Sequence, residues 1–172
     1  MNVSGQSLGE EDFLNFVIAA IDNSGVPPGQ VCFEITETAT IANFQRAIRF
    51  ISILRDMGCV FALDDFGSGL SSFNYLKNLQ VDYLKRDGNF VKEMLNNPID
   101  HALVEATNQI GHAMGIKTIA EFVENQDILE ALRRIGVDYA QDYGIARPYP
   151  MEDIFPEASR PVQPGRLLRA SR

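Results

Sequence analysis

Two adjacent acids, Asp64 and Asp65, directly follow the apolar residues 60–63 and precede a loop with glycines at 67 and 69. An apolar run that stops at acids is typical of a buried strand whose C-terminal end carries them. In a parallel α/β protein, ligands bind at that end because the loops leaving the strands build the pocket there. The pair therefore indicates a site for chemistry, whereas the two glycines alone are weak evidence for a phosphate loop and favour a mobile loop at the mouth.

Other predicted strands end in the same way, with a polar residue after an apolar run. These residues are Asn2, Glu34, Lys85, Glu121 and Gln141. One such residue is ordinary for a solvated strand end, but a succession of them is not. Because the C-terminal ends of parallel strands meet at one mouth, we expect the side chains to converge.

Several carboxylates at one mouth need neutralisation. Two unit charges about 4 Å apart repel by about 4 kcal/mol at an effective dielectric near 20, so a cation, a lysine or bound protons must be present. Oxygen ligands suit Mg²⁺ or Mn²⁺, and the chain has no His/Cys set for zinc. Two such ions could clamp a phosphate. Lys85 could hold a nucleophilic water, its pKa lowered by nearby cations, or act as a counter-ion to Asp64 or Asp65, and spacing leaves both roles open.

Three glycines, at positions 58, 115 and 136, each follow a helical pattern and precede a predicted strand. This order is typical of a left-handed helix C-cap, and it indicates helix-to-strand connections and a parallel sheet. Strands are predicted at 1–4, 31–37, 59–63, 81–85, 116–120 and 137–140, with helices over about 10–21, 47–57, 71–79, 97–114 and 125–132. A closed (β/α) barrel needs eight strands and about 250 residues, so the fold class is α/β, an incomplete TIM-like barrel.

Composition limits the class of protein. A chain of 172 residues with 45% hydrophobic content suits one domain, which we expect over residues 1–156, with a poorly ordered tail at 157–172. The net charge of −8 argues against DNA binding, and no membrane segment is apparent. Cys32 and Cys59 lie in apolar runs, so we expect free thiols and a cytoplasmic location. His101 and His112 are expected to be surface or helix-packing residues.

An ordered set of motifs resembles a known family. The motifs are residues 34–37, residues 63–69, residues 83–85 with 87–88, residues 120–121 with 123–124, Gln141 with Tyr143, and residues 147–148. Together they resemble the EAL-domain cyclic-di-GMP phosphodiesterases of bacterial signalling over about residues 2–150. The resemblance implies a TIM-like barrel that binds two Mg²⁺ or Mn²⁺ ions and hydrolyses cyclic di-GMP to pGpG.

The resemblance also implies roles for individual residues. Lys85 would orient or deprotonate the attacking water, and Asp87 and Gln141 would support the metal and water shell. Glu37 would hold the loop 66–73, and Glu124 would lie at the rim. The implied metal ligands are Asn2, Glu34, Asp64, Asp65 and Glu121.

The chain also departs from the family pattern. It begins at the strand of Asn2, so we expect the segment with the Glu-Ala-Leu signature to be absent, and with it a metal-ligating glutamate and two strands. The missing strands would leave open sheet edges, which favour pairing with a second copy. Arg86 stands where an aliphatic residue is usual and should turn toward the helices, and Phe122 and Asp142 stand where glycines are usual. These departures leave open a degenerate domain that senses cyclic di-GMP or binds a protein. Upstream sensory or GGDEF-type domains are possible, and an unrelated metal-dependent barrel is the remaining alternative.

Overall fold

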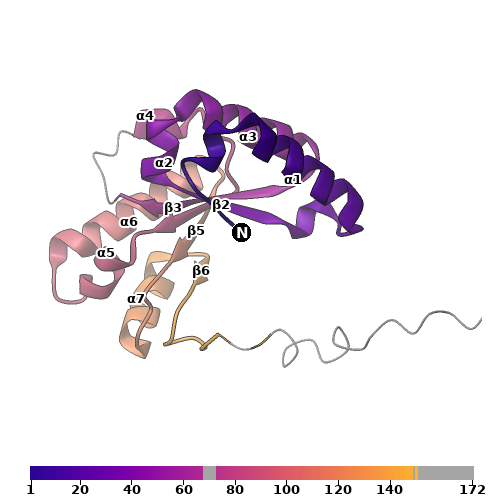
Figure 1. Cartoon of the computed structure of the whole chain (residues 1–172). Helices are drawn as coiled ribbons and strands as arrows, with labels where there is room; N and C mark the ends of the chain where they lie inside the picture. Colours follow the sequence, from indigo (N-terminus) through magenta and orange to yellow (C-terminus); the bar gives the residue numbers. More distant parts are fainter. Residues whose placement is uncertain (68–72, 149, 151–172) are drawn as a thin grey trace, which may run out of the picture.

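The computed structural model describes residues 1–67, 73–148 and 150. In it, six parallel strands form a single sheet in the order of the sequence, β1 to β6 (Figure 1). The predicted domain limit at 156 and the tail at 157–172 lie outside the described residues. The strands are β1 (Asn2–Val3), β2 (Cys32–Thr36), β3 (Val60–Phe66), β4 (Tyr83–Arg86), β5 (Lys117–Ala120) and β6 (Tyr139–Ala140). Within this part of the chain β1 and β6 are the two edges of an open sheet, so the predicted incomplete barrel is confirmed.

Helices follow the strands and cover one face of the sheet (Figure 1). They are α1 (Glu11–Ser24), α2 (Glu37–Ala42), α3 (Phe44–Asp56), α4 (Phe73–Leu76), α5 (Gly88–Glu93), α6 (Pro98–Ala113) and α7 (Gln126–Ile135), with 3₁₀ turns at Ser7–Gly9 and Pro28–Gln30. No helix in the described ranges is long and apolar enough to cross a membrane.

The joints between helices and strands follow the sequence signals. Gly58, Gly115 and Gly136 have φ angles of 100°, 74° and 85°, the left-handed conformation that the pattern predicted. The side chains of Asn97 and Asn125 accept hydrogen bonds from the first turns of α6 and α7. Local capping chemistry therefore sets where these elements begin and end.

Several predicted elements differ from those observed. The strand expected over 31–37 ends at Thr36, because the Thr36 side chain accepts a hydrogen bond from the Ala39 backbone N–H at 3.3 Å and starts α2, with Glu37 as its first residue. Neither α2 nor α5 was predicted. The side chain of Asp87 caps α5 by accepting a hydrogen bond from the Asn89 backbone N–H at 2.9 Å.

The predicted helix over 71–79 is described only from residue 73, and its helical part is Phe73–Leu76. The next strand was predicted over 81–85 and is observed at Tyr83–Arg86.

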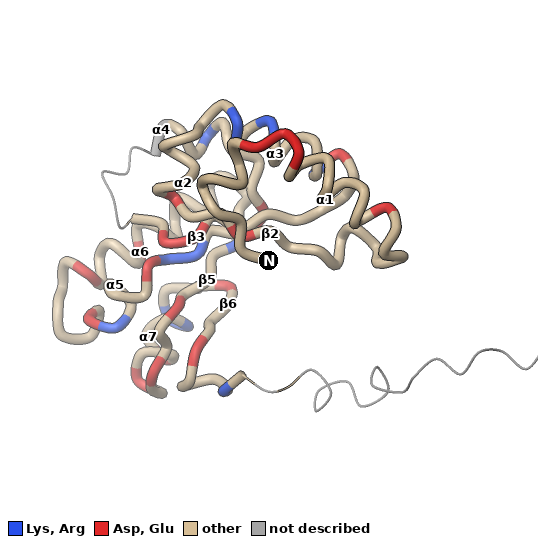
Figure 2. Tube along the Cα trace, in the orientation of Figure 1, with Lys and Arg blue, Asp and Glu red and all other residues tan. Residues whose placement is uncertain are grey.

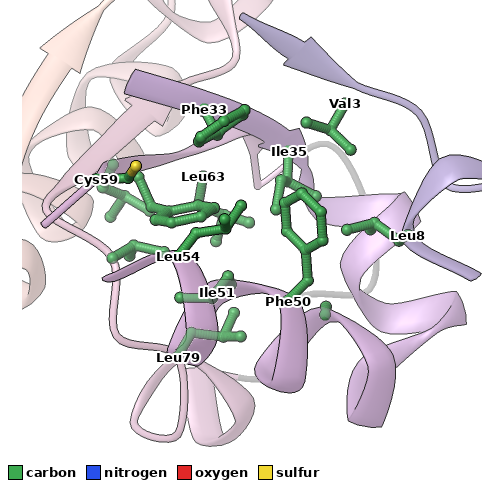
Figure 3. Close-up of a cluster of buried hydrophobic side chains, with 14 of the residues drawn as sticks. Val3, Leu8, Phe33, Ile35, Phe50, Ile51, Leu54, Cys59, Leu63 and Leu79 are labelled. Atoms are coloured by element: carbon green, nitrogen blue, oxygen red, sulfur yellow. The ribbon is translucent and has the colours of Figure 1, made fainter. Parts of the chain in front are cut away.

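The core lies between the sheet and the helices. Phe33 and Ile35 of β2 point toward Phe50 and Leu54 of α3, and all four are at most 2% exposed (Figure 3). Burying each such side chain contributes about 1.5–3 kcal/mol. Along β2 these residues alternate with partly exposed ones, so every second side chain points away from the helices. The polar residues of the candidate site occupy these alternate positions.

Candidate active site

Strand register brings the predicted site residues to one face of the sheet. Asn2 of β1 is the register partner of Glu34 of β2, and Thr36 of β2 is the partner of Asp64 of β3. Neighbouring residues of parallel strands direct their side chains to the same face, here the face that the helices leave uncovered. Figure 2 shows acidic and basic positions meeting where these strands converge.

Lys85 of β4 lies at the centre of this group. Its Nζ lies 2.9 Å from Glu34 Oε2, 3.0 Å from Asp64 Oδ1 and 2.8 Å from Glu121 Oε1, three acids from three other strands or strand ends. The lysine side chain is 5% exposed. Burial would lower the pKa of Lys85, but its hydrogen bonds to these carboxylates raise it above its usual value. In this structure Lys85 is therefore placed as a counter-ion to Glu34, Asp64 and Glu121.

Three carboxylates stand close enough to share a cation. One oxygen each from Asp64, Asp65 and Glu121 lies within 4.8 Å of the others. Burial raises the pKa of Asp65 and Glu121, and in Asp65 the neighbouring charge of Asp64 raises it further. A set of hard oxygen ligands at one mouth fits Mg²⁺ or Mn²⁺ by its chemistry.

Glu37, the first residue of α2, is 1% exposed. Its Oε2 accepts a hydrogen bond from the Gly67 backbone N–H at 2.9 Å, and its Oε1 accepts one from the Tyr75 hydroxyl. Burial and this bond raise the pKa of Tyr75. Glu37 thus contacts the chain on both sides of residues 68–72, which lie outside the described residues. Tyr75 was missed, since no spacing rule connects it with a glutamate 38 residues away.

The remaining predicted residues surround the acids. Asp87 is 9% exposed, caps α5, and is close enough to Asp65 to raise the pKa of Asp65. Glu124 pairs with Lys92 at 3.2 Å on the surface. Gln141 is exposed, and its backbone N–H donates to Ala120 O at 2.9 Å, which holds it at the end of β5.

The three residues that depart from the family pattern are accommodated differently. Arg86 is 6% exposed and lies over the ring of Phe90 at 4.1 Å, on the helical side as expected. Phe122 and Asp142 have φ angles of 54° and 122°, a conformation that favours glycine.

Other side chains fall outside the site. His112 pairs with Asp138 at 2.8 Å, a contact that was not predicted, and His101 lies on the same helix. Cys32 and Cys59 are free thiols.

The fold and the site together define an α/β-barrel domain with an acidic, lysine-centred site at the C-terminal ends of its strands. The chain belongs to the EAL domain family, whose model matches residues 1–148.

Named relatives and solved structures agree with this assignment. The chain is 47% identical over 151 residues to the cyclic di-GMP phosphodiesterase PdeB of Shewanella oneidensis, covering 88% of this chain and 18% of that protein. It is 34% identical over 154 residues to the cyclic di-GMP phosphodiesterase RocR of Pseudomonas aeruginosa, covering 90% and 39%. The chain therefore spans well under half the length of either relative.

Among solved structures, the PaMucR phosphodiesterase in complex with c-di-GMP superposes with a TM-score of 0.84 at 30% identity, covering 89% of this chain and 62% of that one. The FimX EAL domain from Pseudomonas aeruginosa bound to c-di-GMP gives 0.80 at 28% identity, covering 86% and 60%.

Proposed function

We propose that this chain is the larger part of a phosphodiesterase domain that hydrolyses cyclic di-GMP to pGpG. The observation that carries the proposal is the contact of Lys85 with Glu34, Asp64 and Glu121, at 2.8 to 3.0 Å, beside the oxygen cluster of Asp64, Asp65 and Glu121. The names of PdeB and RocR and the ligand in the PaMucR complex support the reaction and the substrate.

The acids would hold two Mg²⁺ or Mn²⁺ ions. The proposed ligands are the side-chain oxygens of Asn2, Glu34, Asp64, Asp65 and Glu121. Such ions, when bound, stabilise charge on a phosphodiester and lower the pKa of a bound water. Burial raises the pKa of Glu121, so cation binding at this acid should weaken as the pH falls, because protons and the cation compete for the carboxylate.

Lys85 provides a fixed ammonium between the strands. It donates hydrogen bonds, so it can orient the attacking water and balance negative charge that develops on the phosphate. We assign Asp87 and Gln141 to the surrounding water shell, Glu37 to the base of the 66–73 loop, and Glu124 to the rim.

The proposal has further parts that concern the parent protein. We propose a domain over residues 1–156, a cytoplasmic location, and pairing of the open edges at β1 and β6 with a second copy, because unpaired strand edges are templates for association. GGDEF-type or sensory domains would account for the greater length of PdeB and RocR.

Product analysis tests the proposed reaction. Purified protein with Mn²⁺ and cyclic di-GMP should release pGpG, and Asp64→Asn should lower the rate by at least about 100-fold, since it removes one of the converging charges. Glu105→Gln, an exposed carboxamide substitution on α6, is the matched control and should keep the wild-type rate. Binding of cyclic di-GMP in calorimetry without any product, in this chain and in the full-length parent, would refute the enzyme and establish the sensor.

A further inference from the structure

The two adjacent acids of β3 depend on an irregularity in the strand. The pairing of β3 with β4 shifts between Leu63 and Phe66, which are three residues apart but pair with residues of β4 only two apart. One residue of β3 is therefore extra, and Asp65 within this bulge has a φ of 53°. In a regular strand, consecutive side chains point to opposite faces. The bulge is what lets both Asp64 and Asp65 present oxygens to the same cluster.

The bulge ends at one peptide group that is held at both ends. The carbonyl oxygen of Phe66 accepts a hydrogen bond from Arg86 Nη1 at 3.1 Å and one from the Asp87 backbone N–H at 3.4 Å. The N–H of the same peptide group, which belongs to Gly67, donates to Glu37 Oε2 at 2.9 Å. A cationic side chain from β4 and an anionic side chain from α2 thus fix the orientation of a single peptide plane, the plane between Phe66 and Gly67.

The surroundings of Arg86 hold its guanidinium against the Phe66–Gly67 peptide group. Its guanidinium is stacked on Phe90, and its Nη1 would lie 1.9 Å from a Cβ placed on Gly67, so it occupies the space that a side chain there would need. Among the described residues, Arg86 Nε finds no hydrogen-bond partner. Burying a guanidinium with incomplete hydrogen bonding is unfavourable, and a long apolar side chain would fill the volume without that cost. An arginine at position 86 is therefore better explained by a role in holding this peptide group than by a contribution to the stability of the fold.

We propose that Arg86 is a positioning residue that, together with Glu37, orients the peptide between Phe66 and Gly67 and so aims the carboxylates of Asp64 and Asp65. It touches neither substrate nor the reacting atoms. The effect on turnover rests on the proposed function, whereas the effect on the bulge does not.

Two substitutions separate this role from a packing role. Arg86→Met keeps a long side chain over Phe90 and removes the guanidinium, while Arg86→Lys keeps a charge but loses the planar donor pair. Arg55→Met is the matched control, because Arg55 also bonds a backbone carbonyl, that of Gln80 at 2.8 Å, away from the site. Arg55 also pairs with Asp82, which accepts a hydrogen bond from the Phe61 N–H, so exchange is compared only at residues 65–67. Hydrogen exchange at residues 65–67, calorimetric Mn²⁺ binding, and kcat and KM for cyclic di-GMP are measured for each protein.

Arg86→Met should speed exchange at residues 65–67 by at least 10-fold, weaken Mn²⁺ binding about 10-fold and lower kcat more than it raises KM, with partial recovery in Arg86→Lys. Arg55→Met should change none of these. If Arg86→Met does not fold, Arg86→Lys must show the same changes at smaller size.

Unchanged exchange at 65–67, or faster exchange with unchanged Mn²⁺ affinity, would overturn the proposal. Wild-type protein that binds Mn²⁺ but releases no pGpG refutes the proposed reaction and leaves the metal-affinity test decisive. If wild-type protein binds no Mn²⁺, exchange alone decides.

Discussion

Replacing Lys85 by methionine would leave Glu34, Asp64 and Glu121 without the ammonium that contacts all three. Methionine has a similar length and no charge, so the change removes electrostatics more than packing. The lysine side chain is 5% exposed and its three partners are 29%, 15% and 15% exposed, so solvent screens these pairs poorly. Removing one partner of such a buried arrangement typically costs about 3–5 kcal/mol.

The repulsion between the carboxylates that remain in Lys85→Met is of similar size. Oxygens of Asp64 and Glu121 lie within 4.8 Å, and two unit charges at that distance repel by about 3.5 kcal/mol at an effective dielectric near 20. Proton uptake by Glu121, whose pKa burial already raises, relieves part of this at lower pH. We therefore expect Lys85→Met to lower the free energy of unfolding by about 3–5 kcal/mol at pH 7, and by less at pH 5.

Urea unfolding followed by circular dichroism measures this loss. Lys92→Met is the matched control, since Lys92 pairs with Glu124 at 3.2 Å with both side chains 49% exposed, and it should cost less than about 1 kcal/mol. Mn²⁺ should stabilise Lys85→Met more than wild type, because the ammonium no longer competes for the carboxylates. At 100 times its dissociation constant a ligand adds about 2.7 kcal/mol. If Lys85→Met loses no more stability than Lys92→Met, or gains no more from Mn²⁺ than wild type, the electrostatic account of the site is refuted.

Two further predictions concern the frame around the site. Burial raises the pKa of Asp138, but hydrogen bonds from the Thr118 backbone N–H and from His112, each at 2.8 Å, lower it overall. The stabilisation is then present above the unfolded-state pKa of about 3.9 and is lost as pH falls through the lower folded-state pKa. In urea unfolding at a series of pH values, Asp138→Asn should therefore reduce the loss of stability toward acid pH. An unchanged loss would contradict this. A Cβ on Gly88 would lie 2.4 Å from Cγ of Phe122. Gly88→Ala should therefore lower the free energy of unfolding by about 1–3 kcal/mol in wild type and by distinctly less in a Phe122→Gly background. A double-mutant cycle of unfolding free energies measures the difference.

The fold could be predicted because its signals are local. A glycine after a helical pattern and an asparagine before one each act through their own backbone, and Gly58, Gly115, Gly136, Asn97 and Asn125 all have the geometry that this requires. Repeated joints of this kind leave a parallel sheet as the simple solution. Convergence of the strand-end acids then follows from topology alone.

The details of the site could not be predicted in the same way, because they depend on contacts between distant residues. The bond from Gly67 to Glu37 spans 30 residues and the bond from Arg86 to Phe66 spans 20. One feature of the sequence does indicate the bulge. Two consecutive acids cannot both face one side of a regular strand, so a site that needs Asp64 and Asp65 together already implies a bulge.

Lys85 alone does not neutralise the acids that cluster at the C-terminal ends of the strands. Four carboxylates, those of Glu34, Asp64, Asp65 and Glu121, face one ammonium among the described residues, so three negative charges remain uncompensated when all four acids are ionised. Burial raises the pKa of Asp65 and Glu121, and the neighbouring carboxylates raise it further. Two divalent cations would supply more charge than these protons and would compete with them. A counter-ion role and a water-orienting role for Lys85 are therefore compatible, because carboxylates that turn to a cation release the lysine donors that now hold them.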